Sequence, residues 1–213
     1  MGFNGNRLII NPSKLQNYII SMQKHCKEIQ DSQTAIESNF KLLGNSWDDK
    51  IYDLTNNVLY DTAKSVGRIY EELRKSIVNA TEQYNEYISI QEYPGQHTIA
   101  GKNISEFLTQ LRGKEVGNKF YENNNTNLDD MQKYILAMQK YIEDTEKIVK
   151  NIRNEYEQIG REGAWVAPQY YQLGNVLNEV EKSIARQMSC LRDANELTRR
   201  KYERLRQLLY GNI

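Results

Sequence analysis

The chain has 213 residues, and its 28 lysines and arginines balance 28 aspartates and glutamates, so its formal net charge is zero. A neutral chain has no overall attraction for nucleic acid or for an anionic membrane. Its 12 glycines and 3 prolines are too few for a turn-rich β-sandwich or barrel, and its 2 cysteines and 2 histidines are too few for a disulfide framework or a structural zinc site. We therefore expect a soluble all-α protein that is not an enzyme and needs no metal or cofactor.

Residues 1–11 lack the basic region and the long apolar run of a secretory signal. The chain contains no run of 18 apolar residues, which a membrane span would need. We expect a cytoplasmic protein, or one exported by a route that does not read a cleavable signal. Cys26 and Cys190 fall in apolar stripes and are predicted to be buried free thiols. His25 is expected on the surface, and His97 suggests no role.

The first predicted helix begins at Asn11-Pro12, where Asn is a suitable N-cap and Pro occupies the first helical position. It ends at the glycine-containing break that starts at Gly44, and Trp47 follows this break. A second helix continues to the stop at Pro94-Gly95. Together the two helices form a predicted antiparallel hairpin over residues 12–90. The stripe expected to be buried in the first helix is Leu15, Ile19, Met22, Cys26, Ile29, Gln33, Ile36, Phe40 and Leu43. The stripe expected in the second helix is Ile51, Leu54, Val58, Val66, Ile69, Leu73, Ile77, Ala80, Tyr84 and Tyr87.

The connection, residues 91–127, contains a segment from Asn103 to Leu111 that could form a short amphipathic helix packed across an end of the bundle. The connection is long enough to cross the whole bundle. Parallel and antiparallel arrangements of the two hairpins therefore both remain open.

An internal repeat is the strongest signal in the chain. Residues 132–140 are identical to residues 16–24 at six of nine positions, an offset of 116. Asn127 precedes the third predicted helix, and Asp129 and Asp130 place negative charge in its first turn, where the helix dipole favours it. Adding 116 to the first stripe gives Met131, Ile135, Met138, Ile142, Thr145, Val149, Ile152, Tyr156 and Ile159.

The repeat continues through the second turn. Gly160 and Gly163 interrupt the helix, and Trp165 follows at an offset of 118 from the first tryptophan. The fourth helix completes a second hairpin over residues 128–210. Its expected stripe is Leu173, Leu177, Val180, Ile184, Met188, Leu191, Thr198, Tyr202, Leu205 and Leu209. One hairpin cannot bury its apolar face alone, so we predict two tandem hairpins that form an elongated four-helix bundle.

Two long helices with a tight turn and one tryptophan at that turn resemble the WXG (ESAT-like) superfamily of type VII secretion. The resemblance covers residues 12–90 and 128–210. The family motif is Trp-x-Gly, whereas this chain has Trp47-Asp48-Asp49 and Trp165-Val166-Ala167. None of the 15 tyrosines is followed four residues later by an acid. The family's Tyr-x-x-x-Asp/Glu export element is therefore lacking, and the resemblance implies that a partner would supply it.

The resemblance implies a secretion substrate or a targeting, chaperone-like partner that docks through its helix faces. Its expected partners are an LXG-type toxin, another WXG-like protein or the secretion ATPase, with no nucleic acid, and its expected state is a monomeric pseudo-dimer or a hetero-oligomer. The implied recognition residues are Trp47, Asp49, Tyr52, Trp165 and Tyr170. Three alternatives remain open: the tryptophans are ordinary core residues, the chain is a scaffold or adaptor without a secretion role, or it is an enzyme completed by an unseen domain.

Overall fold

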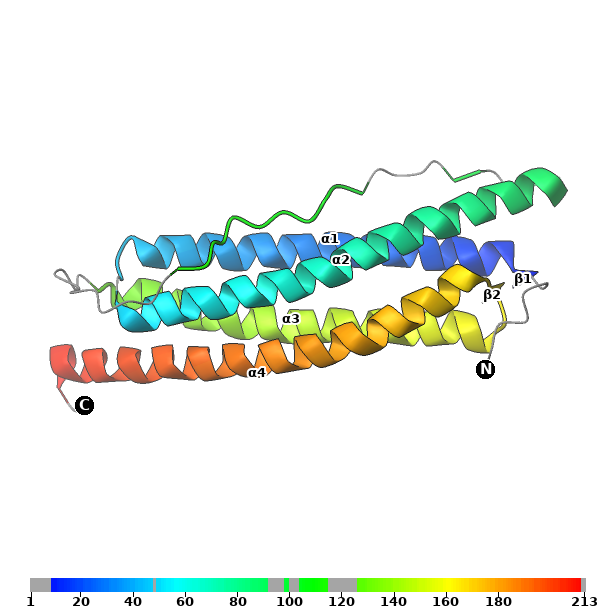
Figure 1. The fold of residues 1–213 in the computed structure, drawn as a ribbon. Helices are drawn as coiled ribbons and strands as arrows, with labels where there is room; N and C mark the ends of the chain where they lie inside the picture. Colours follow the sequence, from blue (N-terminus) through cyan, green and yellow to red (C-terminus); the bar gives the residue numbers. More distant parts are fainter. Residues whose placement is uncertain (1–8, 48, 92–97, 100–103, 115–125, 212–213) are drawn as a thin grey trace. The chain divides into compact units, whose positions relative to one another are not determined.

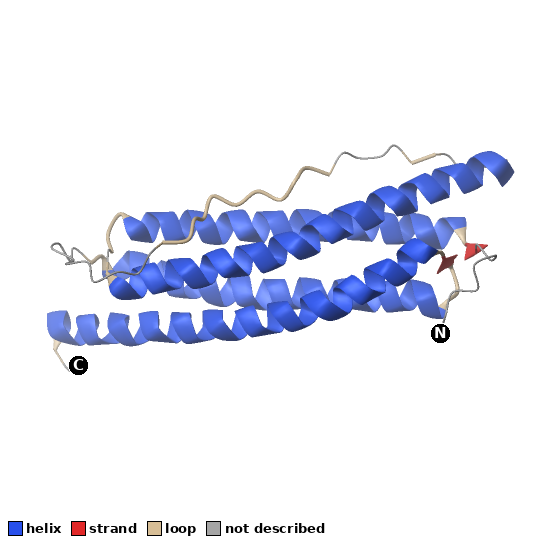
Figure 2. Ribbon diagram, in the orientation of Figure 1, coloured by secondary structure: helices blue, strands red, loops and turns tan. Residues whose placement is uncertain are grey.

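The structure, a computed structural model, describes residues 9–47, 49–91, 98–99, 104–114 and 126–211. Four helices, α1 (Pro12–Gly44), α2 (Lys50–Gln91), α3 (Leu128–Arg161) and α4 (Pro168–Tyr210), pack against each other (Figure 1). The only strands in the described residues are β1 (Ile9–Ile10) and β2 (Trp165–Val166), which pair antiparallel (Figure 2). The predicted all-α bundle is confirmed, with two hairpins that each consist of two antiparallel helices.

The contacts group the chain into two compact units, and each unit takes one segment from every helix. Unit 1 contains residues 1–29, 67–107 and 147–182, so the start of α1 packs with the end of α2, the end of α3 and the start of α4. Unit 2 contains residues 30–66, 108–146 and 183–213. The turn between α1 and α2 belongs to unit 2, and the turn between α3 and α4 belongs to unit 1. Within each unit α1 and α3 run in opposite directions, so the two hairpins are antiparallel.

Side-chain caps explain where the helices begin and end. The Asn11 side chain accepts a hydrogen bond from the Lys14 backbone N–H at 3.2 Å, and Asn127 accepts bonds from the N–H groups of Asp129 and Asp130 at 2.9 and 3.3 Å. The predicted N-cap Asn11 is therefore confirmed, and Asn127, which precedes the third predicted helix, is also an N-cap. At the end of α3, Gly163 adopts a φ of +59°, which lets the backbone N–H groups of residues 163 and 164 bond back to the carbonyls of residues 160 and 159.

The predicted stripes are confirmed most completely in α1, where every member is buried. The α2 stripe starts in the wrong register, because Leu54 is exposed and the polar side chains of Asp53 and Asn56 are buried in its place. The end of the α4 stripe is also wrong, since Leu209 is exposed. Helices α2 and α4, with 42 and 43 residues, are longer than α1 and α3, with 33 and 34 residues. The last residues of both long helices, 89–91 and 206–210, are exposed.

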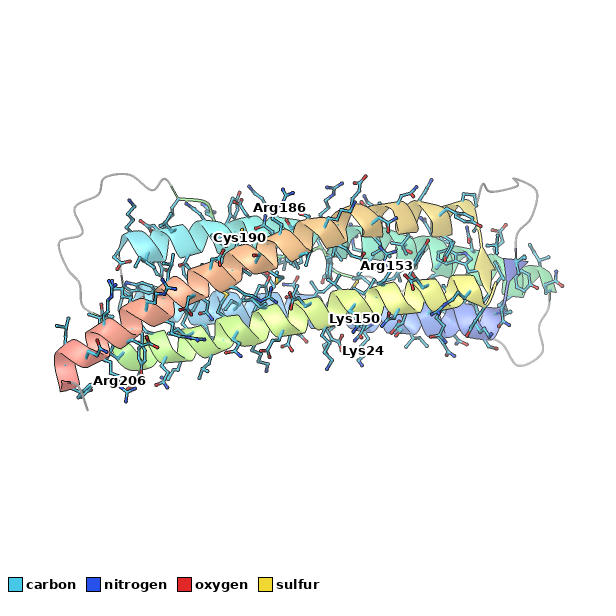
Figure 3. All side chains as sticks on the ribbon, turned by 90° about the horizontal axis from the view of Figure 1, so that it is seen from below. Lys24, Lys150, Arg153, Arg186, Cys190 and Arg206 are labelled. Carbon is cyan, nitrogen blue, oxygen red and sulfur yellow. The ribbon has the colours of Figure 1, made fainter. Side chains whose placement is uncertain are left out.

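The predictions for Cys190 and His25 need correction, whereas the prediction for Cys26 is confirmed. Cys26 is buried, and burial together with the nearby Glu71 carboxylate raises the pKa of its thiol to about 12, so it is an inert core residue. Cys190 is exposed on α4 (Figure 3). His25 is buried because its two ring nitrogens bond to carboxylates, at 2.9 Å to Glu28 and 3.1 Å to Glu155. His97 lies outside the described residues.

The predicted short helix over residues 103–111 is wrong for its described part. Residues 104–114 contain no helical turn and follow an extended path (Figures 1 and 2). Their backbone groups bond to polar side chains of α1 and α2 instead of to each other, as with the Phe107 N–H, which donates to the Glu71 carboxylate at 3.1 Å. Long-range side-chain partners therefore replace the local bonds that a helix needs.

None of the described helices has an apolar stretch long enough to cross a membrane.

Candidate recognition site at the hairpin turns

The first hairpin turn, in unit 2, is closed by an aromatic cluster. The Tyr52 ring, in the first turn of α2, stacks on Phe40 of α1 with ring centres 4.4 Å apart and planes 4° apart. Trp47 meets Tyr52 edge-on at 5.9 Å, and Tyr134 of α3 tilts against Phe40 at 5.6 Å. Offset and edge-on contacts of this kind are the favoured geometries of aromatic pairs. The cluster joins α1, the turn, α2 and α3.

Gly44 makes this stacking possible. A methyl group at position 44 would approach the Tyr52 Cζ atom to 3.0 Å, and it would lie closer still to the hydroxyl oxygen. Any larger residue would force the tyrosine side chain to shift from this position. The glycine is therefore required by a close approach of a side chain at the end of α1.

The second hairpin turn, in unit 1, repeats this arrangement. Tyr170 of α4 stacks on Tyr156 of α3 at 4.4 Å and 13°, and Trp165 meets Tyr170 edge-on at 5.8 Å. Tyr18 of α1 packs against Trp165 at 5.7 Å. Gly160 leaves room for Tyr170, whose Cζ atom would lie 2.6 Å from a methyl group at position 160.

The two clusters are built from equivalent positions of the repeat. With offsets of 116 before the tryptophan and 118 from it onward, the equivalent pairs are Tyr18 and Tyr134, Phe40 and Tyr156, Gly44 and Gly160, Trp47 and Trp165, and Tyr52 and Tyr170. The structure thus brings the predicted tryptophan and tyrosine of each turn together. Each cluster also contains three further residues that were not predicted as recognition residues, one from each of the first three equivalent pairs. Their signal was available, since all three equivalent pairs share the offset of 116.

The two indole N–H groups have different environments. Trp165 Nε1 donates to Gln83 Oε1 of α2 at 2.8 Å. Trp47 Nε1 is buried and has no hydrogen-bond partner among the described residues. The position equivalent to Gln83 is Lys201, whose ammonium lies 5.1 Å from the centre of the Trp47 ring and forms an ion pair with Asp49. Burial lowers the pKa of Lys201.

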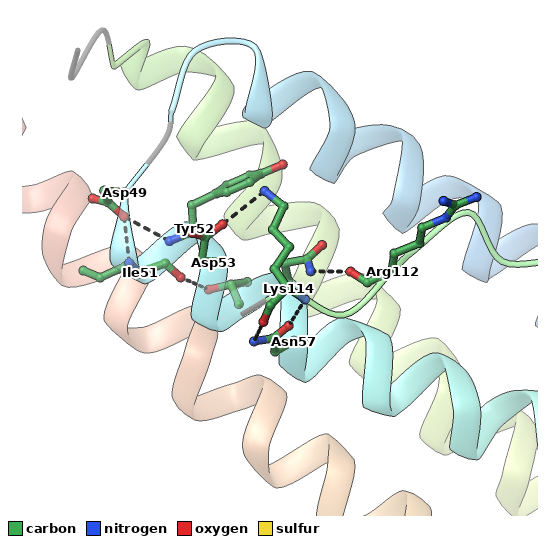
Figure 4. Close-up of polar contacts among 9 residues, drawn as sticks. Asp49, Ile51, Tyr52, Asp53, Asn57, Arg112 and Lys114 are labelled. Carbon is green, nitrogen blue, oxygen red and sulfur yellow. Dashed lines mark hydrogen bonds and ion pairs between the residues drawn. The ribbon is translucent and has the colours of Figure 1, made fainter. Parts of the chain in front are cut away.

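Asp49 is the N-cap of α2 (Figure 4). Its Oδ1 atom accepts the backbone N–H groups of Ile51 at 2.8 Å and Tyr52 at 3.0 Å, and its Oδ2 atom pairs with Lys201. Both carboxylate oxygens are therefore engaged within the chain. The equivalent position in the second turn is Ala167, which is followed by Pro168 at the start of α4. The acid in the first turn thus has a local role as a helix cap.

Of the predicted recognition residues, both tryptophans and Tyr52 are buried in their turns, whereas Asp49 and Tyr170 are half-buried. The relative exposure of Trp47 is 1% and that of Trp165 is 0%, so neither indole is available to a partner at the surface. Burial raises the pKa values of Tyr18 and Tyr134, which keeps both phenols neutral. Among the described residues, no group of three or more His, Cys, Asp or Glu side chains is placed to hold a metal ion. These arrangements fix the hairpin turns and present only the surrounding helix faces for contact.

Comparisons of the chain with protein-family models, with curated proteins and with solved structures gave no match.

Proposed function

We propose that the chain is a non-enzymatic interaction protein of type VII secretion, either a substrate or a targeting partner that docks through its helix faces onto a second protein such as an LXG-type toxin. The observation that supports this proposal is the pair of matched turn clusters. One chain holds two copies of a helix–turn–helix unit whose tryptophan, stacking tyrosine and close-approach glycine occupy equivalent places. Such a chain is an internal pseudo-dimer of WXG-like hairpins.

The exposed helix faces offer a specific docking candidate. Ile20 of α1 is 54% exposed, and its repeat equivalent Leu136 of α3 is 59% exposed. Single exposed apolar residues are common on protein surfaces, so neither is unusual alone. Both copies of the repeat nevertheless keep a large aliphatic residue facing solvent at the same position. We infer that this position contacts the partner.

Co-purification with a toxin encoded beside this chain tests the proposal. Ile20→Ser and Leu136→Ser should each weaken binding by about tenfold or more if each position anchors the partner, because buried apolar anchors dominate such contacts. Leu42→Ser is the matched control, since Leu42 is 60% exposed and its repeat equivalent is already polar, Gln158. Equal binding by all three variants would contradict the docking face. Unchanged export after deletion of the secretion ATPase would contradict the secretion role.

A helical scaffold or adaptor without a secretion role is the second candidate, and the burial of both indoles favours it. Under this alternative Trp47→Ala and Trp165→Ala lower thermal stability but leave partner binding unchanged. Loss of the secretion ATPase then has no effect on where the protein is found. A partner that binds the folded chain and is exported with it would exclude the alternative.

A further inference from the structure

Residues 108–114 lie extended in unit 2 and are held by five polar side chains of α1 and α2. We call these five side chains the peptide clamp. They are Gln30, Glu37, Asp53, Asn56 and Asn57. Extended polypeptide has no internal backbone bonds, so its N–H and C=O groups need outside partners. The clamp supplies partners for backbone groups of residues 108, 110, 112 and 114.

Within the bound segment, three amide side chains of the clamp contact only backbone atoms. Gln30 donates to the Leu108 carbonyl at 3.0 Å and accepts from the Leu108 N–H at 3.1 Å. Asn57 does the same for Lys114, with both distances at 2.8 Å (Figure 4). Asn56 donates to the Arg112 carbonyl at 2.8 Å. A side-chain amide that bonds both groups of one residue copies the pairing of a neighbouring β-strand. It therefore recognises extended backbone irrespective of side chain.

The two acids of the clamp select side chains. Glu37 accepts the Thr109 hydroxyl at 2.6 Å and the Gln110 N–H at 2.9 Å. Asp53, whose side chain is 1% exposed, pairs with the Lys114 ammonium at 3.1 Å. A buried carboxylate strongly favours a cation at that place.

Position 113 is also selective. A methyl group on Gly113 would come within 3.1 Å of the Tyr60 ring, which favours glycine there. The clamp thus fits a segment with the pattern Thr-x-x-x-Gly-Lys, as in residues 109–114.

The repeat shows that hairpin packing does not require the clamp. The turn cluster is present in both hairpins, whereas four of the five clamp positions differ in the second. The second-hairpin residues equivalent to the clamp are Glu146, Arg153, Tyr171, Gly174 and Asn175. Only the asparagine at position 57 is kept. The clamp is therefore an addition to the first hairpin that serves the binding of an extended segment.

The bound segment is held mainly by polar contacts at the surface. Leu108 is 66% exposed, and Thr109, Gln110, Arg112, Gly113 and Lys114 are exposed as well. Water can replace the exposed hydrogen bonds that Gln30, Glu37 and Asn57 make, so these contacts add little net stability, and local opening of the segment costs less than global unfolding. A competing segment with the same bonds can take its place.

We propose that the peptide clamp is a binding site for an extended segment of a partner protein that has a hydroxyl side chain followed four and five residues later by glycine and lysine, and that residues 108–114 fill this site in the free chain. The chain's own segment is a tethered competitor at an effective concentration of roughly 1 mM. The inference does not depend on a role in secretion, because it concerns the purified chain and a peptide.

The test measures binding of a fluorescent peptide with the sequence of residues 107–114 to the full-length chain. The wild-type chain should bind it with an apparent Kd of roughly 1 mM, set by the tethered competitor. The double variant Gly113→Val/Lys114→Ala weakens the tethered segment and leaves the clamp intact, so it should bind at least tenfold tighter. Adding Asp53→Asn should reverse that gain. Arg112→Ala, which keeps the backbone contact, should behave as wild type.

A control peptide and a second measurement complete the experiment. A peptide in which valine and alanine replace the glycine and lysine should bind at least tenfold more weakly. Equal binding of both peptides, no gain in the double variant, or self-association of that variant in place of peptide binding would each overturn the proposal. If circular dichroism shows the variant to be unfolded, hydrogen exchange of the wild-type chain decides. Excess peptide should then speed exchange at the amides of residues 108–114, and unchanged exchange would overturn the proposal.

Discussion

The fit between Tyr156 and Gly174 gives the sharpest test of the repeated turn architecture. In the second hairpin, a methyl group at position 174 would lie 2.8 Å from the Tyr156 Cζ atom and closer still to its hydroxyl oxygen. In the first hairpin the equivalent residues are Phe40, which has no hydroxyl, and Asn56, which has a full side chain. The second hairpin therefore has both the tyrosine hydroxyl and the glycine, and the first hairpin has neither.

Two opposing free-energy terms set the expected effect of Gly174→Ala. Glycine within a helix costs about 1 kcal/mol relative to alanine, so the change would stabilise α4 if the space were open. Crowding of a packed core costs about 1–3 kcal/mol. Since Tyr156 is buried and stacked on Tyr170, its ring cannot move away freely. We expect the free energy of unfolding to fall by up to about 2 kcal/mol in total.

Urea unfolding of Gly174→Ala, Tyr156→Phe and the double variant tests this balance. Removal of the hydroxyl should relieve much of the crowding, so the double variant should be more stable than the sum of the single changes predicts, by about 1–2 kcal/mol. The first hairpin provides a matched control, in which Phe40→Tyr should destabilise the chain because Asn56 stands at the position equivalent to Gly174. Additive effects, or a Gly174→Ala variant more stable than wild type, would refute the reasoning.

Three further predictions concern the turns and the buried histidine. Trp165→Phe should lower the free energy of unfolding by about 1–2 kcal/mol more than Trp47→Phe, because only the former breaks a hydrogen bond, and equal losses in chemical denaturation would contradict this. Asp49→Ala should lower the free energy of unfolding by about 1 kcal/mol through loss of the α2 cap, whereas Asp49→Asn, which can still cap, should retain most of the stability. Thermal unfolding of both variants tests this, and equal midpoints would contradict it. Burial raises the pKa of Glu28, but the hydrogen bond from His25 and the charge of His25 lower it by more, so that the pKa of Glu28 lies below its ordinary value. The stability from this carboxylate is present above the unfolded-state pKa and is lost as pH falls through the folded-state pKa. Glu28→Gln should therefore destabilise the chain at about pH 6 and make little difference at about pH 2, and an equal effect at both pH values would contradict the assignment.

Local signals gave correct predictions wherever a short stretch of chain determines its own structure. The α1 stripe from Leu15 to Leu43 is buried at every position, and Asn11 caps its helix as predicted. The repeat also placed each turn tryptophan five residues before the tyrosine that it contacts, as with Trp47 and Tyr52. Helical periodicity and capping depend on residues a few positions apart, so the sequence contains this information directly.

Predictions failed where the partner lies far along the chain. Leu54 was assigned to the core, but the buried places near it belong to Asp53 and Asn56, whose side chains bind residues 112–114. His25 is buried, and one of its two carboxylate partners, Glu155, lies 130 residues away in sequence. Residues 104–111 have a helix-like pattern, yet they lie extended because side chains of α1 and α2 satisfy their backbone.

The sequence by itself determined the four helices, their caps, the duplicated hairpin and the positions of both turns. Only the tertiary structure decided that the hairpins run antiparallel and that the aromatic pairs of each turn meet a tyrosine from the other hairpin, as Tyr18 does with Trp165. It also decided that both indoles are buried and that an extended segment is held by a clamp of polar side chains. Periodicity specifies which face of a helix is apolar. Packing of distant segments selects which side chains meet on that face, and whether a polar residue can be buried there with a partner.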